Sequence, residues 1–571
     1  MYLNKNHHNK TMKKYLLCLV AICLSSLTFA QEQIKINIIL NEQSDATTLS
    51  REASWLPTKQ QRRAYVVETL KHHAETSQQE LMGLLRELEQ NGLVSGIQPL
   101  WIVNSICCYA TKDVIHSLEE RRDVMTVYQC EEVHGLFDEE ITLTDSGGVH
   151  EIAENLLKVN VDKAWDLGFT GQGVLIAIID TGVEMSHADL QGRLWDGGTA
   201  YPHHGYDFYS HDDDPSDTQG HGTHVAGTLV GTGASGTRTG VAPDAEIMVL
   251  KVFHGEDNLS EATLWVEAMQ FALDHGADVL NMSLGQPLPN AGTKLMLRQA
   301  CDNTLAAGVV AAVCAGNSRQ IQMLAPVPNN IWSPGDCPPP YLHEDQMVNA
   351  GGTSCVICVG AVDNNDVLGG FSSEGPSTWT DVTQFSDYPY ISGSPTQIGL
   401  IRPDVCAPGV NIKSLDFNTS NGYCLKSGTS MATPMVAGTI ALMLSKEPEL
   451  TPAQIDEILE NTAVPLTSHK SNDFGSGRID ALAAVNAVPT WNDVIEVDGH
   501  QGHIFPNPSK DVFTIECEGM HLIEVYGMDG QLVKHIQTAS PVHQLKGLTS
   551  GTYLVKITTD DAVIVKKVVK L

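Results

Sequence analysis

The central part of the chain alternates apolar runs with stretches of helical spacing. Apolar residues occupy nearly every position of five runs, at residues 174–180, 246–252, 279–283, 309–313 and 355–362. Such runs are typical of strands that are buried on both faces of a parallel sheet. Helical stretches, such as residues 262–275, lie between them. The pattern predicts a three-layer α/β/α domain with a mostly parallel sheet over residues 155–490.

The residues ahead of this domain have a different pattern. Helical spacing over 68–88 and 112–120 is interleaved with strand-like stretches at 34–40, 97–103, 105–110 and 124–128. The order β-α-β-β-α-β predicts a ferredoxin-like α+β unit over residues 31–135. Residues 136–154 are acidic and rich in turn formers, and we expect an exposed linker that is cut during processing.

The C-terminal residues 503–571 contain short alternating strands. They cover residues 512–515, 522–526 and 553–557, and Met528-Asp529-Gly530 is a hairpin signal. These features predict a small all-β sandwich domain, joined to the central domain by a linker at 491–502. Within the central domain, the proline-rich residues 319–353 predict an irregular insertion, which a disulfide through Cys337 would staple.

The N-terminus has the form of a secretory signal peptide over residues 1–30. Lys13 and Lys14 precede an apolar run at 15–24, and small residues end the segment at Ala30. The apolar run is too short to span a membrane comfortably. We therefore expect a protein that is exported, either released or held at the cell surface.

The net charge argues against one class of partner, and the cysteine pattern argues against one kind of metal site. The 571 residues carry a formal net charge of -33, which argues against nucleic acid as a partner, because nucleic-acid binding needs basic patches. Of 13 cysteines, Cys18 and Cys23 lie in the signal peptide, so an odd number remains and at least one thiol stays unpaired. Cys355 and Cys358 would point to opposite faces of a strand, which favours two core thiols over a metal clamp.

One octapeptide, residues 427–434, combines a glycine turn with the start of a helix. Ser430 would lie beside free backbone N–H groups at the positive end of the helix dipole, a suitable place for a nucleophile whose attack creates an oxyanion. Thr433 and Pro434 are expected in the first turn, where proline is tolerated. A serine in this position is equally typical of a helix N-cap, and this stretch alone leaves both readings open.

Two more polar residues follow buried strands. Asp180 ends the first apolar run, and Asn317 follows the fourth. Because the carboxyl ends of parallel strands form the active-site edge, Asp180 is placed to hold a histidine and Asn317 to donate to an oxyanion. The alternatives are a helix-capping aspartate and a turn asparagine.

A histidine opens a helix rich in small residues at 220–227. His221 is expected at the exposed start of the helix, whereas His224 should point elsewhere. A metal site on this pair is disfavoured, because the glutamate of the metalloprotease pattern is absent.

Together these segments resemble the subtilisin-like serine proteases, the subtilase family. The order Asp, His, Ser is that of the subtilisin triad. The stretches that match are Asp180-Thr181-Gly182, residues 220–227, Asn281-Met282-Ser283-Leu284-Gly285, Ala315-Gly316-Asn317, Arg402-Pro403-Asp404-Val405, Ala407-Pro408-Gly409 and Gly428-Thr429-Ser430-Met431-Ala432.

The resemblance implies a secreted serine endopeptidase that acts through an acyl-enzyme. In that mechanism His221 takes the proton of Ser430, Asp180 orients His221, and Asn317 receives the oxyanion with the backbone N–H of Ser430. The resemblance also implies that Ser283, Leu284 and Gly285 pair with the substrate backbone, so peptides and proteins are the expected substrates.

The resemblance implies that no cofactor is required for the chemistry. Subtilases often bind structural calcium. The acidic residues 211–217 lack the spacing of an EF-hand, however, so no metal ligand is assigned.

The flanking units carry resemblances of their own. The N-terminal unit resembles the inhibitory propeptide of subtilases, which implies a zymogen whose own propeptide is an intramolecular inhibitor.

The C-terminal unit resembles the type A sorting domain of the type IX secretion system, which implies outer-membrane passage in a Bacteroidetes-type Gram-negative host. The matching stretches are Phe505-Pro506-Asn507-Pro508, residues 525–531 and residues 551–557. A generic β-sandwich binding module is the alternative. We expect a monomer.

Two other functions remain as alternatives at this point. A surface adhesin built on a degraded protease fold would not react with a fluorophosphonate, whereas an activated serine would. A zinc hydrolase that used His221 and His224 would lose activity to a chelator and would show no serine labelling.

Overall fold

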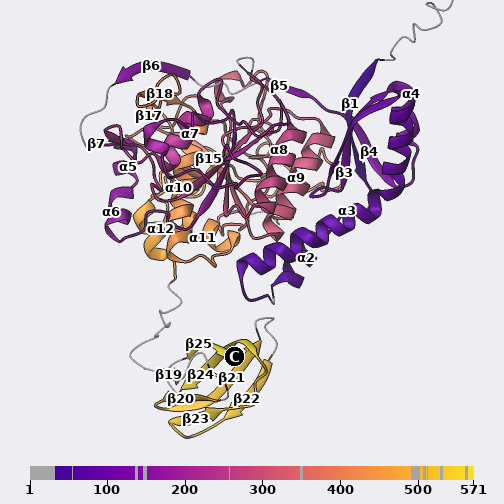
Figure 1. The fold of residues 1–571 in the computed structure, drawn as a ribbon. Helices are drawn as coiled ribbons and strands as arrows, with labels where there is room; N and C mark the ends of the chain where they lie inside the picture. Colours follow the sequence, from indigo (N-terminus) through magenta and orange to yellow (C-terminus); the bar gives the residue numbers. More distant parts are fainter. Residues whose placement is uncertain are drawn as a thin grey trace, which may run out of the picture.

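The computed structural model describes residues 32–489 and 502–570, apart from positions 55, 135–138, 146–150, 256–257, 347–350, 506–508, 511, 528–531 and 560–562. The predicted signal peptide, the hairpin signal at 528–530 and most of the linker at 491–502 therefore lie outside the described residues. Figure 1 shows an N-terminal α+β unit, a central α/β unit and a C-terminal β unit along the chain.

The central unit is built on a seven-stranded sheet in which every neighbouring pair is parallel. The strand order is β16-β15-β14-β13-β8-β11-β9. The strands are β8 (Leu175–Asp180), β9 (Gly205–Asp207), β11 (Glu246–Lys251), β13 (Val279–Met282), β14 (Val310–Cys314), β15 (Val356–Val362) and β16 (Val405–Pro408). The five apolar runs are β8, β11, β13, β14 and β15, so the predicted α/β class is confirmed.

Helices cover both faces of this sheet. Ile176 and Ile178 of β8 pack into one apolar cluster, and Ala177 and Ile179 pack into the other, because successive strand residues point to opposite faces. Helices α7 (His221–Val230) and α10 (Thr429–Lys446) cover the first face, and α8 (Ala262–Asp274) and α9 (Ala291–Ala306) cover the second (Figure 1). Because helices cover both faces of the sheet, side chains on both sides of each strand are buried, which explains the continuous apolar runs.

Short elements complete the central unit. They are β7 (Glu151–Ile152), α5 (Glu154–Lys158), α6 (Val161–Asp166), η1 (Ala188–Leu190), β10 (Thr237–Arg238), β12 (Leu259–Glu261), η2 (Arg319–Ile321), β17 (Ile412–Leu415), β18 (Tyr423–Ser427), α11 (Pro452–Thr462) and α12 (Ala481–Ala487). Apart from η2, the described part of the insertion at 319–353 contains no helix or strand, as its prolines predict.

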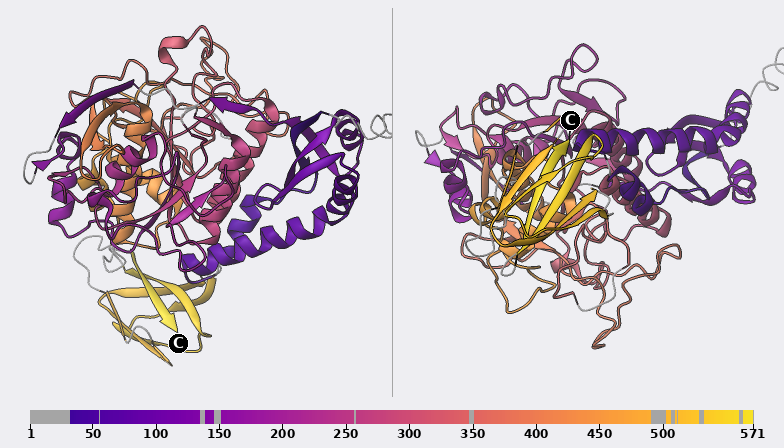
Figure 2. Two further views of the ribbon diagram at one scale, coloured as in Figure 1. Left: turned by 45° about the horizontal axis from the view of Figure 1, so that its top comes forward. Right: turned by 90° about the horizontal axis from the view of Figure 1, so that it is seen from below.

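The N-terminal unit is a four-stranded antiparallel sheet with helices packed on it. Its strand order, β2-β3-β1-β4, is that of the predicted ferredoxin-like fold. The elements are β1 (Gln33–Leu40), α2 (Ala46–Ala53), α3 (Lys59–Gln90), β2 (Val94–Leu100), β3 (Ser105–Thr111), α4 (Lys112–Glu119) and β4 (Val124–Gln129). Helix α3 starts nine residues earlier than its spacing predicts. Thr58 caps its start, and its first turns lie against the central unit (Figure 2).

Two short strands follow, one just ahead of the linker predicted at 136–154 and one inside it. Strand β5 (Glu132–His134) pairs antiparallel with β12, and β6 (Glu139–Asp145) pairs antiparallel with β18. The backbone of both segments thus adds a strand to an edge of the central unit. Edge pairing uses backbone groups and leaves almost no signal in side-chain hydropathy, which is why the pattern missed it.

The C-terminal unit is the predicted β-sandwich. Three strands form one sheet in the order β19-β20-β23, and four form another in the order β22-β21-β24-β25. Phe513 and Ile515 from the first sheet share one core with Val525 and Val555 from the second. The strands are β19 (Gly502–Phe505), β20 (Phe513–Cys517), β21 (Met520–Gly527), β22 (Leu532–Gln537), β23 (Val542–Leu545), β24 (Gly551–Thr559) and β25 (Val563–Lys570).

Every cysteine that the structure describes is a free thiol, including Cys337, so the predicted staple through Cys337 is not formed. Cys355 and Cys358 are both buried, and they pack into different apolar clusters, as expected for two core thiols on opposite faces of a strand. Among the described helices, none combines the length and hydropathy that a bilayer span requires.

Candidate functional site

Asp180 and His221 form a buried pair at the carboxyl end of the sheet. Nδ1 of His221 lies 2.7 Å from Oδ1 of Asp180, and each side chain is 1% exposed. The same oxygen accepts the backbone N–H of Thr181 at 2.7 Å. Burial raises the pKa of Asp180, and the charge and hydrogen bond of His221 oppose that rise. The arrangement can hold the imidazole in one tautomer and stabilise its protonated form.

The close approach of helix α7 to β8 requires glycine. A Cβ atom on Gly222 would lie 2.1 Å from the carbonyl oxygen of Gly182 and 3.1 Å from Oδ1 of Asp180. No side chain fits in that space. The small residue after His221 is therefore needed to bring the two site residues together.

Asp217 is a further site residue, which the sequence analysis did not single out. Its carboxylate accepts the backbone N–H groups of Gln219, Gly220 and Thr223 at 2.9, 2.9 and 3.0 Å. It also accepts the hydroxyl of Thr181 at 3.0 Å. One carboxylate thus binds N–H groups just before and within the first turn of α7 and ties them to the loop after Asp180. An aspartate just ahead of a helix start was the available signal.

His224 faces away from the pair, as predicted. Its Nε2 lies 2.9 Å from the carbonyl oxygen of Ile412 in β17. Burial lowers the pKa of His224 well below its ordinary value. The rings of His221 and His224 are engaged with different elements, so the structure does not bring them together as metal ligands.

Ser430 is the second residue of α10 and exchanges two hydrogen bonds with Ser283. Its hydroxyl donates to the carbonyl of Ser283 at 3.2 Å, and the hydroxyl of Ser283 donates to the carbonyl of Ser430 at 2.8 Å. Pro434 explains the second bond: it lies four residues after Ser430 and has no N–H for that carbonyl. The expectation that Pro434 lies in the first turn is wrong, because α10 begins at Thr429.

Asn317 follows β14 and is held by α10. Its Oδ1 accepts the backbone N–H of Thr429 at 3.0 Å and the hydroxyl of Thr429 at 2.9 Å. Because both partners donate, this atom is the oxygen of the amide, and the NH₂ group faces the other way. Thr429 belongs to the motif that identified Ser430, but its role in orienting Asn317 was not predicted.

The three residues expected to pair with a substrate strand follow β13. Ser283, Leu284 and Gly285 are all buried. Beyond them, Gln286 forms two backbone hydrogen bonds with Ser333, at 2.9 and 3.1 Å. Its side-chain amide also donates to Glu131 at 2.9 Å. The end of the N-terminal unit thus lies beside this segment.

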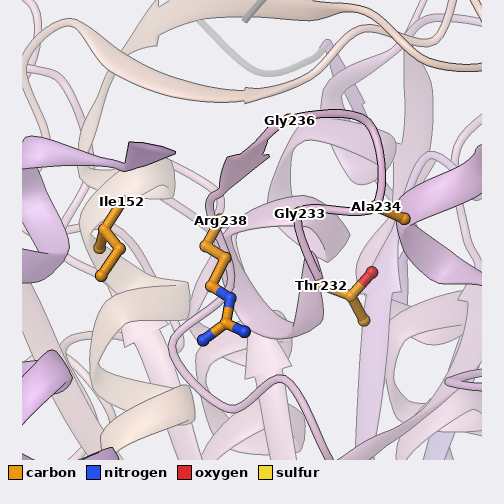
Figure 3. Close-up of a pocket in the computed structure, with 6 residues that line it drawn as sticks. All are labelled: Ile152, Thr232, Gly233, Ala234, Gly236 and Arg238. Atoms are coloured by element: carbon orange, nitrogen blue, oxygen red, sulfur yellow. The ribbon is translucent and has the colours of Figure 1, made fainter. Parts of the chain in front are cut away.

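The glycine-rich loop at 231–236 lies away from this edge and is held by a carboxylate. In the glycine run at 231–236, the N–H groups of Gly233 and Ser235 donate to the carboxylate of Asp189, at 3.2 and 2.7 Å. A hollow of about 460 Å³ lies nearby and is lined by residues of this loop, with Ile152 and Arg238 (Figure 3). Within the described residues, no group of acidic, histidine or cysteine side chains is arranged to hold a metal ion.

Comparison with known proteins agrees with this geometry. Residues 171–478 match the sequence model of the subtilase family, and residues 503–571 match that of the secretion system C-terminal sorting domain.

Three curated proteins illustrate the similarity. Bacillopeptidase F of Bacillus subtilis (strain 168) is 30% identical over 474 residues, which are 77% of this chain but only 30% of that protein. Serine protease AprX of the same strain is 32% identical over 409 residues, 67% of this chain and 79% of that protein. Subtilisin DY of Bacillus licheniformis is 33% identical over 326 residues, 57% of this chain and 96% of that protein.

The family match covers more than half of the chain and contains Asp180, His221, Asn317 and Ser430. The parallel sheet, the buried Asp–His pair and the serine at the start of a helix all lie inside the matched region. The chain belongs to the subtilase family of serine peptidases.

Proposed function

We propose that the protein is a secreted endopeptidase whose nucleophile is Ser430, with His221 as general base and Asp180 as the residue that orients it. The buried 2.7 Å contact between Asp180 and His221 carries the proposal, because a buried carboxylate stabilises the imidazolium that forms when serine loses its proton. His221 then returns the proton to the leaving amine as the acyl-enzyme forms, and water releases the acyl group.

Asn317 and the backbone N–H of Ser430 are proposed to receive the oxyanion. The amide oxygen of Asn317 accepts both donors of Thr429, so its NH₂ group is directed away from Thr429 and is the donor that we assign to the oxyanion. The start of α10 adds the positive end of a helix dipole at the same place. Donors that are fixed before the reaction stabilise the developing charge without reorganisation.

The substrate backbone is proposed to add a strand along Ser283, Leu284 and Gly285. A substrate N–H at the carbonyl of Ser283 would replace the hydroxyl of Ser430, which donates there at 3.2 Å. The hydroxyl is then available to His221. This exchange links substrate binding to activation of the nucleophile.

The N-terminal unit, residues 32–134, is proposed to be an inhibitory prosegment. Its last strand, β5, pairs with β12 of the central unit, and β6 pairs with β18 up to Ser427, three residues before Ser430. Strand β6 therefore lies beside the segment that leads into the proposed nucleophile. We expect the activating cut within the linker predicted at residues 136–154.

The C-terminal sorting domain implies export, with a secreted or surface location. We propose that the type IX machinery of a Gram-negative Bacteroidetes-type cell carries the protein across the outer membrane, after a signal peptide at residues 1–30 directs it across the inner one. The protein is proposed to act as a monomer. No cofactor is proposed for the chemistry, and a structural calcium site stays unassigned.

Covalent labelling tests the proposed nucleophile. A fluorophosphonate should label the processed wild-type protein at Ser430, and Ser430→Ala should abolish both the label and peptide hydrolysis. Ser420→Ala, at an exposed serine, is the matched control and should keep both. Hydrolysis without labelling, removed by a chelator, would instead indicate a metal mechanism. A folded protein that shows neither labelling nor hydrolysis would indicate a binding function.

A further inference from the structure

The indole of Trp332 lies between the two segments that flank the proposed nucleophile. Trp332 belongs to the irregular insertion and is 1% exposed. Its backbone N–H donates to the carbonyl of Ala315 at 3.0 Å. The next residue, Ser333, forms the two backbone hydrogen bonds to Gln286. The backbone at 332–333 is therefore attached both to the segment after β14 and to the segment after β13.

Two glycines show how closely the indole fills the space between these segments. A Cβ atom on Gly285 would lie 2.9 Å from Cβ of Trp332, and one on Gly316 would lie 2.5 Å from Cγ of the indole. Carbon atoms do not approach so closely in folded proteins. Gly316 also has a φ of 102°, which disfavours any other residue there. The volume between the two segments is thus occupied by the tryptophan side chain.

A hydrogen bond fixes the ring in this position. Nε1 of Trp332 donates to the hydroxyl of Ser318 at 2.6 Å, and Ser318 is fully buried. Ser318 directly follows Asn317. A buried indole whose N–H has a partner would lose that bond if it swung out, so the ring is expected to stay in place when substrate arrives.

The position of the ring limits the substrate residue that contributes the attacked carbonyl. In the proposed mechanism, the carbonyl oxygen of that residue points to Asn317 and its N–H to Ser283. Its side chain must then enter the space between residues 283–285 and 315–317. We propose that Trp332 fills this space and confines the enzyme to peptide bonds that follow glycine, alanine or serine. This inference rests on the proposed function.

Wild-type enzyme tests the inference directly. Internally quenched peptides that differ only in the residue before the scissile bond should show kcat/KM for alanine about 100-fold above that for phenylalanine, because a packed site has no room for a ring. Trp332→Ala should raise kcat/KM for leucine and phenylalanine at least about tenfold. Trp165→Ala is the control: it removes another indole with a bonded N–H, which donates to the carbonyl of Val241 at 2.9 Å, and it should leave the ratio unchanged.

Fluorophosphonate titration separates this inference from the proposed function. If wild-type enzyme is labelled but cleaves after leucine or phenylalanine as fast as after alanine, the role of Trp332 is wrong and the nucleophile stands. If it is not labelled, the proposed function itself fails. The wild-type peptide series decides the matter even if Trp332→Ala does not fold, and Trp332→Phe provides a milder enlargement of the same space.

Discussion

The amide oxygen of Asn317 accepts both the backbone N–H and the hydroxyl of Thr429, at 3.0 and 2.9 Å. The amide group is therefore locked between β14 and the start of α10. Thr429 also precedes Ser430 in the chain. One threonine thus sets the distance between the proposed oxyanion donor and the proposed nucleophile.

We predict that Asn317→Ala lowers kcat by about 10²–10³-fold with little change in KM, because the donor is used only when charge develops on the substrate oxygen; this is the size of the effect known for such a donor in subtilisin. Thr429→Val should have a smaller effect, roughly tenfold, since the backbone N–H still orients the amide. Steady-state kinetics with one peptide substrate measures both.

Thr429→Ser is the matched control, because it keeps the hydroxyl. It should retain nearly wild-type kcat. A larger loss for the serine variant than for the valine variant would show that the methyl group, and not the hydrogen bond, is what matters at this position.

Asp180→Asn should lower kcat by roughly 10⁴-fold while the protein remains folded. The asparagine fits the same space, but it cannot stabilise a charged imidazole and it favours the wrong tautomer of His221. Asp166→Asn, at an exposed residue near the end of α6, is the control and should be fully active. A loss below tenfold at Asp180 would contradict the role of the buried pair.

The hydrogen bond between Ser283 and the carbonyl of Ser430 should depend on Pro434. Ser283→Ala leaves that buried carbonyl without its partner at 2.8 Å, and we expect a loss of about 1–3 kcal/mol in the free energy of unfolding. In a Pro434→Ala background, the restored N–H can satisfy the carbonyl, so the same change should cost less.

Urea unfolding of the four proteins in this double-mutant cycle, all blocked by fluorophosphonate to prevent self-digestion, measures the coupling. Additive effects would mean that the proline is not the reason why Ser283 is needed.

Docking of the prosegment should weaken as the pH rises. Glu267 of α8 lies where the prosegment packs, with Gln98 Nε2 at 3.4 Å and with Lys35 and Glu261 as the charged neighbours. Burial raises the pKa of Glu267 from 4.5 to about 7. The docked form therefore keeps a proton that the separated form loses. The free energy of docking therefore becomes less favourable as the pH rises from 4.5 to about 7, and it changes no further above that pH.

We expect the cut prosegment to dissociate at least about tenfold faster at about pH 8 than at about pH 5. The measurement is size-exclusion chromatography of the complex with Ser430 blocked, so that catalysis plays no part. Glu267→Gln has no proton to lose and should show a much flatter profile. A slope that is the same in both proteins would assign the pH dependence to another group.

A buried ion pair should hold the prosegment more strongly than an exposed one. Nζ of Lys59 lies 2.9 Å from Asp278 with the lysine side chain 10% exposed, whereas the similar pair of Lys71 and Asp274 is about a third exposed. Lys59→Met leaves a carboxylate partly uncompensated and should speed release of the cut prosegment by about 10- to 100-fold. Lys71→Met should change it less than about fivefold. Similar increases in the release rate for the two variants would show that the buried ion pair does not hold the prosegment more strongly than the exposed one.

Local sequence patterns were sufficient to predict the architecture of the central unit. The apolar runs predicted β8, β11, β13, β14 and β15, because a strand buried on both faces must be apolar at every position. The ferredoxin-like order of the N-terminal unit followed from the alternation of two periods along the chain. The short motifs around Asp180, His221 and Ser430 were readable since each needs particular residues at fixed spacing.

Other features depend on contacts between residues that are far apart in the chain, and no local pattern reveals them. The edge pairing of β5 and β6 uses backbone groups, which every sequence has. Trp332 appeared only as one apolar residue in a proline-rich insertion. The sequence by itself determined the family and the motifs that carry the proposed site residues. Only the tertiary structure decided what fills the space beside them, because packing places Trp332 against Gly285 and Gly316 across more than fifteen residues of chain.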